Sequence, residues 1–203
     1  GAVRLRMTGS ANMVKMLRFA AEQDAEALLE IYRPYVETTS ITFETQVPTV
    51  AEFTERIRDI LTMFPYLVIE EGGKLLGYAY AHPFHQRAAY DWTVESSIYV
   101  RQDARHEHLG TLLYEALLER LACQGVRNVC AVVTVPNEPS TAFHKRMGFH
   151  SAGILPDFGY KMGQWHGVEY LYLRLGAEKE APKPLIPQTA LPEELRTPVI
   201  LDN

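Results

Sequence analysis

The chain has little of several features that would assign a protein to a class at once. It contains only two cysteines, Cys123 and Cys130, among 203 residues, and this number excludes a disulfide-rich scaffold. Cys123 falls on an expected helix and Cys130 in an apolar strand, so we expect both to be reduced core thiols. The histidines show no metal-ligand spacing, and we therefore expect no metal.

The sequence also lacks the signals of membranes and nucleic acids. No apolar run approaches the roughly 18 residues that a membrane-spanning helix needs, and the N-terminus shows no signal-peptide pattern. The formal net charge of -5 argues against general binding of nucleic acid. We therefore expect a cytoplasmic protein that has neither nucleic acid nor a membrane as a partner.

With 47% hydrophobic residues, the chain can bury one substantial core. Residues 1–14 are expected to be a disordered or tag-derived leader. Residues 15–176 form one expected domain, and 177–203, with five prolines, form an extended tail that packs on the body or on a partner subunit. Periodicity predicts strands at 16–20, 66–70, 75–82, 90–100, 128–135, 149–155 and 168–175. It predicts helices at 22–37, 49–64, 111–123 and 137–147, the first of them kinked or ended by Pro34.

These elements predict an α/β fold, with about four helices flanking a single mixed sheet of about seven strands. The segment from Ile98 to Cys123 is the most informative part, because a strand leads through a polar loop into an amphipathic helix. Unpaired N–H groups at a helix start favour anions, above all phosphate. The nucleotide P-loop and the dinucleotide fingerprint are both absent. On the loop alone, an ordinary connection between strand and helix is the alternative interpretation.

Two motifs narrow this interpretation to a family. Arg105-His-Glu-His-Leu-Gly110 resembles the pyrophosphate loop of the GNAT superfamily of acyl-CoA-dependent N-acetyltransferases, which is usually written Gln/Arg-x-x-Gly-x-Gly/Ala. His108 stands where that family usually has glycine, although histidine is among the residue types tolerated at positive φ. A second segment resembles the family's Asn-x-x-Ala/Ser-x-x-x-Tyr-x-x-x-Gly-Phe motif; it runs from Asn137 to Phe149 and has His144 at the tyrosine position.

Further segments resemble the phosphinothricin N-acetyltransferases, a subfamily that includes enzymes acting on methionine sulfone and methionine sulfoximine. They lie at 39–43, 77–81, 89–100 and 159–166. The resemblance implies the GNAT fold, acetyl-CoA as co-substrate and a homodimer. It implies N-acetylation of a small free amino acid analogue, by direct attack in a ternary complex. Acetylation of another small amine or of a peptide N-terminus is one alternative, and a non-catalytic acyl-CoA-binding protein is another.

The resemblance also implies roles for single residues. Glu95 corresponds to the subfamily's proposed general base, and a carboxylate in a half-buried aromatic cleft can accept a proton through water. Two roles are open to His144, namely donation to the departing thiolate or a share of the base role. A backbone N–H near Tyr99 or Val100 would hold the oxyanion.

The remaining implied residues bind the two substrates. Those expected to contact acetyl-CoA are Tyr99, Val100, Arg105, His106, His108, Leu109, Gly110, Thr111, Asn137, Ser140 and Lys145. Those expected to contact the acceptor are Phe43, Arg87, Tyr90, Ser97 and Trp165. Arg87 could pair in a bidentate manner with a carboxylate or phosphinate, and the aromatic residues would wall the pocket.

Overall fold

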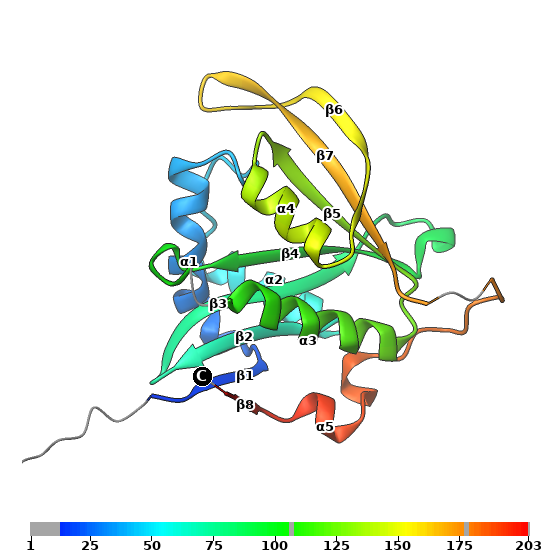
Figure 1. Ribbon diagram of the computed structural model, residues 1–203. Coiled ribbons are helices and arrows are strands. Elements are labelled where there is room, and N and C mark those ends of the chain that lie inside the picture. Colours follow the sequence, from blue (N-terminus) through cyan, green and yellow to red (C-terminus); the bar gives the residue numbers. More distant parts are fainter. Residues whose placement is uncertain (1–12, 106–107, 177–178, 203) are drawn as a thin grey trace, which may run out of the picture.

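A mixed sheet of eight strands, in the order β6-β7-β5-β4-β3-β2-β1-β8, forms the middle layer of the protein (Figure 1). The computed structural model describes residues 13–105, 108–176 and 179–202. Only β4 and β5 pair in parallel, and the other neighbouring strands are antiparallel. The strands are β1 (Lys15–Phe19), β2 (Tyr66–Glu71), β3 (Lys74–Pro83), β4 (Thr93–Val100), β5 (Asn128–Val135), β6 (His150–Lys161), β7 (Gln164–Arg174) and β8 (Val199–Leu201).

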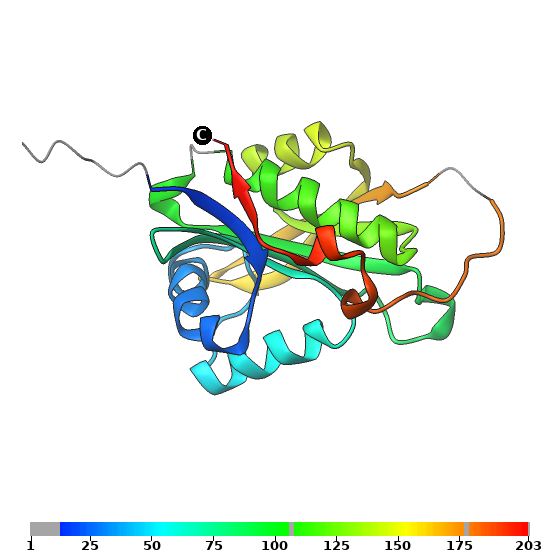
Figure 2. The same ribbon diagram turned by 90° about the horizontal axis from the view of Figure 1, so that it is seen from below.

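The helices cover both faces of the sheet (Figure 2). They are α1 (Ala25–Thr38), α2 (Val50–Leu61), α3 (Leu109–Gln124), α4 (Glu138–Arg146) and α5 (Glu193–Arg196). Alternation along the strands gives each face its own core. In β2, Tyr66 and Val68 pack with α1 and α2, whereas Leu67 and Ile69 pack with α3 on the other face.

The expected order of elements is confirmed from β1 to β7, and the tail adds α5 and β8. Val199, Ile200 and Leu201 pair with the exposed edge of β1. Buried Arg120 donates through Nε to the Leu195 carbonyl at 2.8 Å, so the tail packs on its own body. Pairing between the two ends of a chain leaves no local sequence pattern, which is why the sequence predicted an extended tail here.

Two other local predictions need correction. Of the two effects expected of Pro34, ending the helix is wrong, because α1 continues to Thr38. The hydroxyls of Thr38 and Thr39 donate to the carbonyls of Pro34 and Tyr35 at 2.7 Å, and these bonds satisfy acceptors that the helix end leaves free. The strand expected over 90–100 begins only at Thr93, because residues 88–90 form a 3-10 turn.

The last two strands are longer than predicted and form one hairpin. Residues 157–166, expected as a connection, pair across the hairpin from Gly159↔His166 to Lys161↔Gln164. The turn at Met162 and Gly163 has positive φ at both residues (55° and 78°), as a two-residue hairpin turn requires. A register shift between Leu155 and Gly159 accommodates Pro156, and the hairpin rises above the body (Figure 1).

The cysteine prediction was half right. Both thiols are free, and Cys130 is buried in β5. Cys123 is exposed instead, because it lies on the solvent side of α3, whose buried side is formed mainly by leucines, together with Tyr114, Arg120 and Gln124.

The parallel strands β4 and β5 separate soon after they meet. They pair only at Thr93↔Asn128, Val94↔Val129 and Glu95↔Cys130. β4 then stays paired with β3 to Val100, and β5 stays paired with β7 to Val135. The sheet therefore opens in its middle, beyond Glu95.

Candidate active site

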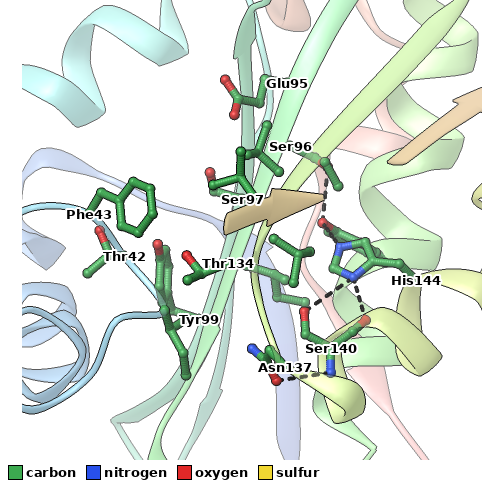
Figure 3. A pocket seen from close by; sticks show the side chains of 17 residues that line it. Thr42, Phe43, Glu95, Ser96, Ser97, Tyr99, Thr134, Asn137, Ser140 and His144 are labelled. Atoms are coloured by element: carbon green, nitrogen blue, oxygen red, sulfur yellow. Dashed lines mark hydrogen bonds between the residues drawn. The ribbon is translucent and has the colours of Figure 1, made fainter. Parts of the chain in front are cut away.

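A cavity of about 220 Å³ occupies the opening between β4 and β5 (Figure 3). Its strand walls run from Glu95 to Tyr99 and from Ala131 to Thr134. The loop after α1 adds Ile41, Thr42 and Phe43, and α4 adds Ser140 and His144. Two divergent strands, a loop and a helix thus enclose one space.

The alternation of β4 side chains divides this cavity between the two faces of the sheet. Glu95, Ser97 and Tyr99 share one face, and Tyr99 packs with the core under α1 and α2. Ser96 and Ile98 point to the opposite face, where Ile98 packs with the core under α3. Figure 3 shows Glu95 and His144 on opposite sides of β4. The opening therefore connects two surfaces that carry different side chains.

A second cavity, of about 660 Å³, lies at the N-terminus of α3. Arg105, His108, Gly110, Thr111 and Arg146 contribute to its wall. His108 is the N-cap and adopts the left-handed conformation (φ 57°, ψ 20°). The first turn of α3 contains no acidic residue, so the helix dipole and two guanidinium groups make this end of the cavity attractive to anions.

Both cavities share Ile41, Ile98, Asn137 and Ser140 in their walls. They therefore join into one groove that leads from the N-terminus of α3 into the opening of the sheet. Asn137 fixes the start of α4 at this junction, because its side chain accepts from the Ser140 N–H at 3.4 Å. A long ligand with an anionic end fits such a groove, with its other end between β4 and β5.

His144 is buried at the junction, and both ring nitrogens have partners. Nδ1 lies 2.8 Å from the Ser140 carbonyl, which can only accept, so Nδ1 carries the hydrogen. Nε2 then accepts from the Tyr114 hydroxyl at 3.0 Å, and that hydroxyl lies 3.0 Å from Ser96 Oγ. Burial lowers the pKa of His144. The ring is therefore a neutral, fixed imidazole at neutral pH.

The loop that carries Phe43 is held by the β6–β7 hairpin. Lys161 is only 5% exposed, and its Nζ donates to the carbonyls of Thr42 and Tyr35 at 2.8 and 3.4 Å. Gly159 leaves room for the Phe43 ring, since a Cβ at residue 159 would overlap it. The far end of the hairpin therefore determines where one wall of the first cavity stands.

The structure brings most of the predicted site residues together. In the first cavity are Phe43, Glu95, Ser97, Tyr99, Asn137, Ser140 and His144. In the second are Val100, Arg105, His108, Gly110 and Thr111. His106 lies outside the described residues.

Five predicted residues do not line either cavity. Arg87 and Tyr90 are exposed in the loop before β4, and Trp165 is 60% exposed at the end of the hairpin. Lys145 is exposed on α4, whose next residue Arg146 reaches the groove instead. Leu109 is buried in the core at the start of α3, so only its backbone is available to a ligand.

Sequence reasoning missed several groups that the structure places at the site. Thr42, Tyr114 and Thr134 line the first cavity, and Lys161 supports it. In the sequence, Tyr114 looks like one more buried position of an amphipathic helix. Only its hydrogen bond to His144 indicates a role at the site. Lys161 gave no usable signal, because residues 157–166 were expected to be a connection and its partners lie far away in the sequence, at Tyr35 and Thr42.

Among the residues that the structure describes, no group of three or more His, Cys, Asp and Glu side chains could hold a metal ion. In the same part of the chain, no helix combines the length and the apolar character needed to cross a bilayer.

Comparisons with known proteins identify the family that this chain resembles. The family described as acetyltransferase (GNAT) domain matches residues 17–167. A phosphinothricin N-acetyltransferase of Streptomyces viridochromogenes is 37% identical over 175 residues, which are 86% of this chain and 95% of that protein. An L-methionine sulfoximine/L-methionine sulfone acetyltransferase of Pseudomonas aeruginosa is 35% identical over 175 residues, covering 84% of this chain and 100% of that one.

A solved structure agrees at the level of the backbone. The phosphinothricin acetyltransferase of Sinorhizobium meliloti, in complex with AcCoA, has a TM-score of 0.80 and 34% sequence identity. The match covers 84% of this chain and 94% of that chain.

The Lys161 contact predicts a local effect on the Phe43 loop. Lys161→Met removes the donor from the Thr42 carbonyl in the loop and from the Tyr35 carbonyl in α1, and a lost hydrogen bond of this kind costs about 1–3 kcal/mol. We expect amide hydrogen exchange in residues 40–44 to become about tenfold faster, because local opening costs correspondingly less. Lys74→Met is the control, since Lys74 is 57% exposed and lies 3.8 Å from Asp103. Equal exchange in both variants would contradict the proposed anchoring.

Proposed function

The chain belongs to the GNAT acetyltransferase family, and from this premise we propose that it acetylates the α-amino group of a small amino acid analogue. The family makes it an N-acetyltransferase with acetyl-CoA as co-substrate. The proposed acceptors are of the phosphinothricin, methionine sulfone or methionine sulfoximine type. This choice is supported by the activities for which two relatives are named, each of which matches 84% or more of the chain.

The continuous groove is the observation that carries this proposal. Its α3 end would hold the pyrophosphate through the backbone N–H groups from His108 to Thr111 and through Arg105 and Arg146. Asn137 and Ser140 stand where the two cavities meet, and they would contact the pantetheine arm. The thioester would then lie in the opening between β4 and β5, within reach of an acceptor on the other face.

Glu95 is the proposed general base. It lines the first cavity on the face that also carries Ser97, Tyr99 and Phe43, which is where the acceptor amine would enter. A neutral amine is required for attack on the thioester, and a carboxylate can take the ammonium proton directly or through one water. Attack then proceeds by direct transfer in a ternary complex.

His144 lies on the co-substrate side, so we assign it to the departing thiolate and not to the amine. Its imidazole is neutral, and its Nδ1–H lies 2.8 Å from the Ser140 carbonyl and 3.4 Å from Ser140 Oγ. Because Nδ1–H is already donated to the Ser140 carbonyl, the ring would act through the adjacent Ser140 hydroxyl, without a charge of its own.

The backbone of β4 favours Val100 over Tyr99 as the oxyanion donor. Arg101 N–H donates to the Leu76 carbonyl at 2.8 Å, so it points toward β3. N–H groups alternate in direction along a strand, and the Val100 N–H therefore points away from β3 into the opening. The Val100 carbonyl also points away from β3, because it accepts a hydrogen bond from the Tyr35 hydroxyl on that side.

A homodimer would complete this site. In the described chain, no lysine or arginine lines the first cavity, although an amino acid acceptor carries a carboxylate. β6 is an edge strand whose apolar side chains are exposed by more than half at Ile154, Phe158 and Tyr160. An exposed apolar edge strand of this kind is a typical site of association with another protein chain. We propose that a second copy of the chain covers the hairpin.

The cytoplasm is the proposed location. Both cysteines are free, and unpaired thiols are the rule in that compartment. Cell fractionation would test this proposal, and recovery outside the soluble cytoplasmic fraction would contradict it.

The function is tested by release of CoA thiol from acetyl-CoA with a panel of amines. The panel contains L-phosphinothricin, L-methionine sulfone, L-methionine sulfoximine, their D forms, ordinary amino acids, a short peptide and polyamines. We expect L-specific turnover of at least one of the three analogues and little on polyamines or the peptide. Preference for the peptide or for polyamines would replace the proposed acceptor class.

The Glu95 assignment predicts a loss of turnover without a loss of binding. Glu95→Gln keeps the size of the side chain and removes the base, so we expect kcat to fall about 100-fold or more. The KM for acetyl-CoA should change little, because Glu95 lies outside the α3 end of the groove. Glu115→Gln, an exposed change on α3, serves as the control. Full turnover by the Glu95 variant would remove this residue from the base role.

The hairpin predicts a change of mass in solution. By light scattering, the protein should weigh about twice the 23.0 kDa of one chain. Phe158→Lys places a charge in the proposed interface and should give a monomer. Ile200→Lys is the control, because Ile200 is 69% exposed but lies on β8, away from the hairpin. A monomeric parent protein would overturn the dimer.

A further inference from the structure

A histidine stands directly beside the proposed base. In the register of β3 and β4, His82 is the Cα partner of Glu95, so the two side chains project from the same face of the sheet. His82 Nε2 lies 3.4 Å from Glu95 Oε2. Nothing in the motifs singles out His82, because only the strand register brings it to this place.

The other ring nitrogen determines what this contact can do. His82 Nδ1 lies 3.0 Å from the Pro83 carbonyl. A carbonyl only accepts, so Nδ1 carries a hydrogen and Nε2 is the nitrogen that gains or loses a proton. An Nε2 atom without a hydrogen and a carboxylate oxygen are both hydrogen-bond acceptors and cannot bond to each other. A proton on either atom makes it a donor to the other. The pair is therefore suited to share one proton.

The two members of the pair have different surroundings. Glu95 lines the cavity between β4 and β5, whereas His82 does not. The His82 side chain is 37% exposed against 27% for Glu95. A proton that moves from Glu95 to His82 thus moves from the cavity toward solvent.

The other titratable groups around the pair are held neutral or paired. Burial raises the pKa of Tyr80, which packs beside the His82 ring, and the pKa of Tyr114. On β5 and β7, burial raises the pKa of Cys130 to about 12 and also raises that of Tyr170, and the charge of Glu95 adds to both shifts. On the α1–α2 side, Glu44 and Arg56 form an ion pair with each other at 2.5 Å.

We propose that His82 is a positioning residue that takes the proton from Glu95 and releases it to solvent. The inference rests on the proposed function, because it requires Glu95 to act as the base. The acceptor ammonium gives one proton to Glu95, Glu95 passes it to His82 Nε2, and the imidazolium gives it to water. After attack, the nitrogen loses a second proton, and this proton neutralises the CoA thiolate. Acetylation of an ammonium group releases one net proton, and His82 carries that one.

The pair can be tested with a variant that small molecules can rescue. His82→Ala removes the imidazole from a partly exposed position, so free imidazole can reach the site. We expect kcat to fall about tenfold, a smaller loss than that of the base itself. The KM values for acetyl-CoA and for the acceptor should stay within about twofold. Added imidazole should restore kcat in proportion to its concentration, and the solvent deuterium isotope effect on kcat should rise.

Two further variants keep the result interpretable. His82→Gln fills the same space without a titrating nitrogen, so it should show the same loss of kcat even if the alanine variant folds poorly. His85→Ala, in the exposed loop that follows β3, should keep the kcat of the parent protein, and added imidazole should not change it. A parent-like kcat in both His82 variants, or a lost kcat that imidazole fails to restore in a folded His82→Ala protein, would overturn the proposal.

The outcomes also separate this inference from the proposed function. If the parent protein turns over no amine, the function itself fails. If Glu95→Gln is fully active, the base assignment fails and this inference fails with it. If Glu95→Gln is inactive while both His82 variants are normal, only the role of His82 is lost.

Discussion

The parallel contact between β4 and β5 is three residue pairs long, and the existence of the site depends on its being so short. Continued pairing would have used the inward backbone groups of β4 and closed the sheet. Both strands can separate without fraying, because β3 holds β4 and β7 holds β5 along their outer sides. Backbone groups left along the opening need other partners. Under the proposed function a thioester and its acceptor would meet that need, so the break in the sheet would serve the chemistry directly.

Burial then decides which groups at the opening carry charge. Burial raises the pKa of Tyr99 on the α1–α2 face, and on the opposite face it raises the pKa of Tyr114 and lowers that of His144. Apart from Glu95, the polar side chains along the middle of the groove are therefore neutral. Fixed positive charge lies at its α3 end, with Arg105 and Arg146. A co-substrate with a charged tail and a neutral reacting end matches this distribution along its whole length.

The sequence could predict what is encoded locally, and it failed where distant segments decide. The strand–loop–helix corner lies within one short segment, so its anion-binding character could be predicted, whereas Asn137 was taken from the resemblance and its role as a cap was not predicted. The full length of the hairpin was missed, because Pro156 and the glycines around it look like loop until β7 pairs with them. The partners of His82 and Lys161 come from other elements, at Glu95 and at Thr42. Arg87 and Trp165 were taken from the resemblance, and one chain alone does not bring them to the cavity.

The departure at His108 shows what the phosphate-loop motif encodes. Glycine is usual there because left-handed backbone costs other residues about 1–2 kcal/mol, yet His108 adopts φ 57° and still precedes a regular helix. The direction of the N–H groups that follow depends on these backbone angles and not on the side chain. The anion donors are therefore kept, and the cost falls on stability. Because the imidazole lines the groove, the substitution adds a polar wall to the site without removing a donor from it.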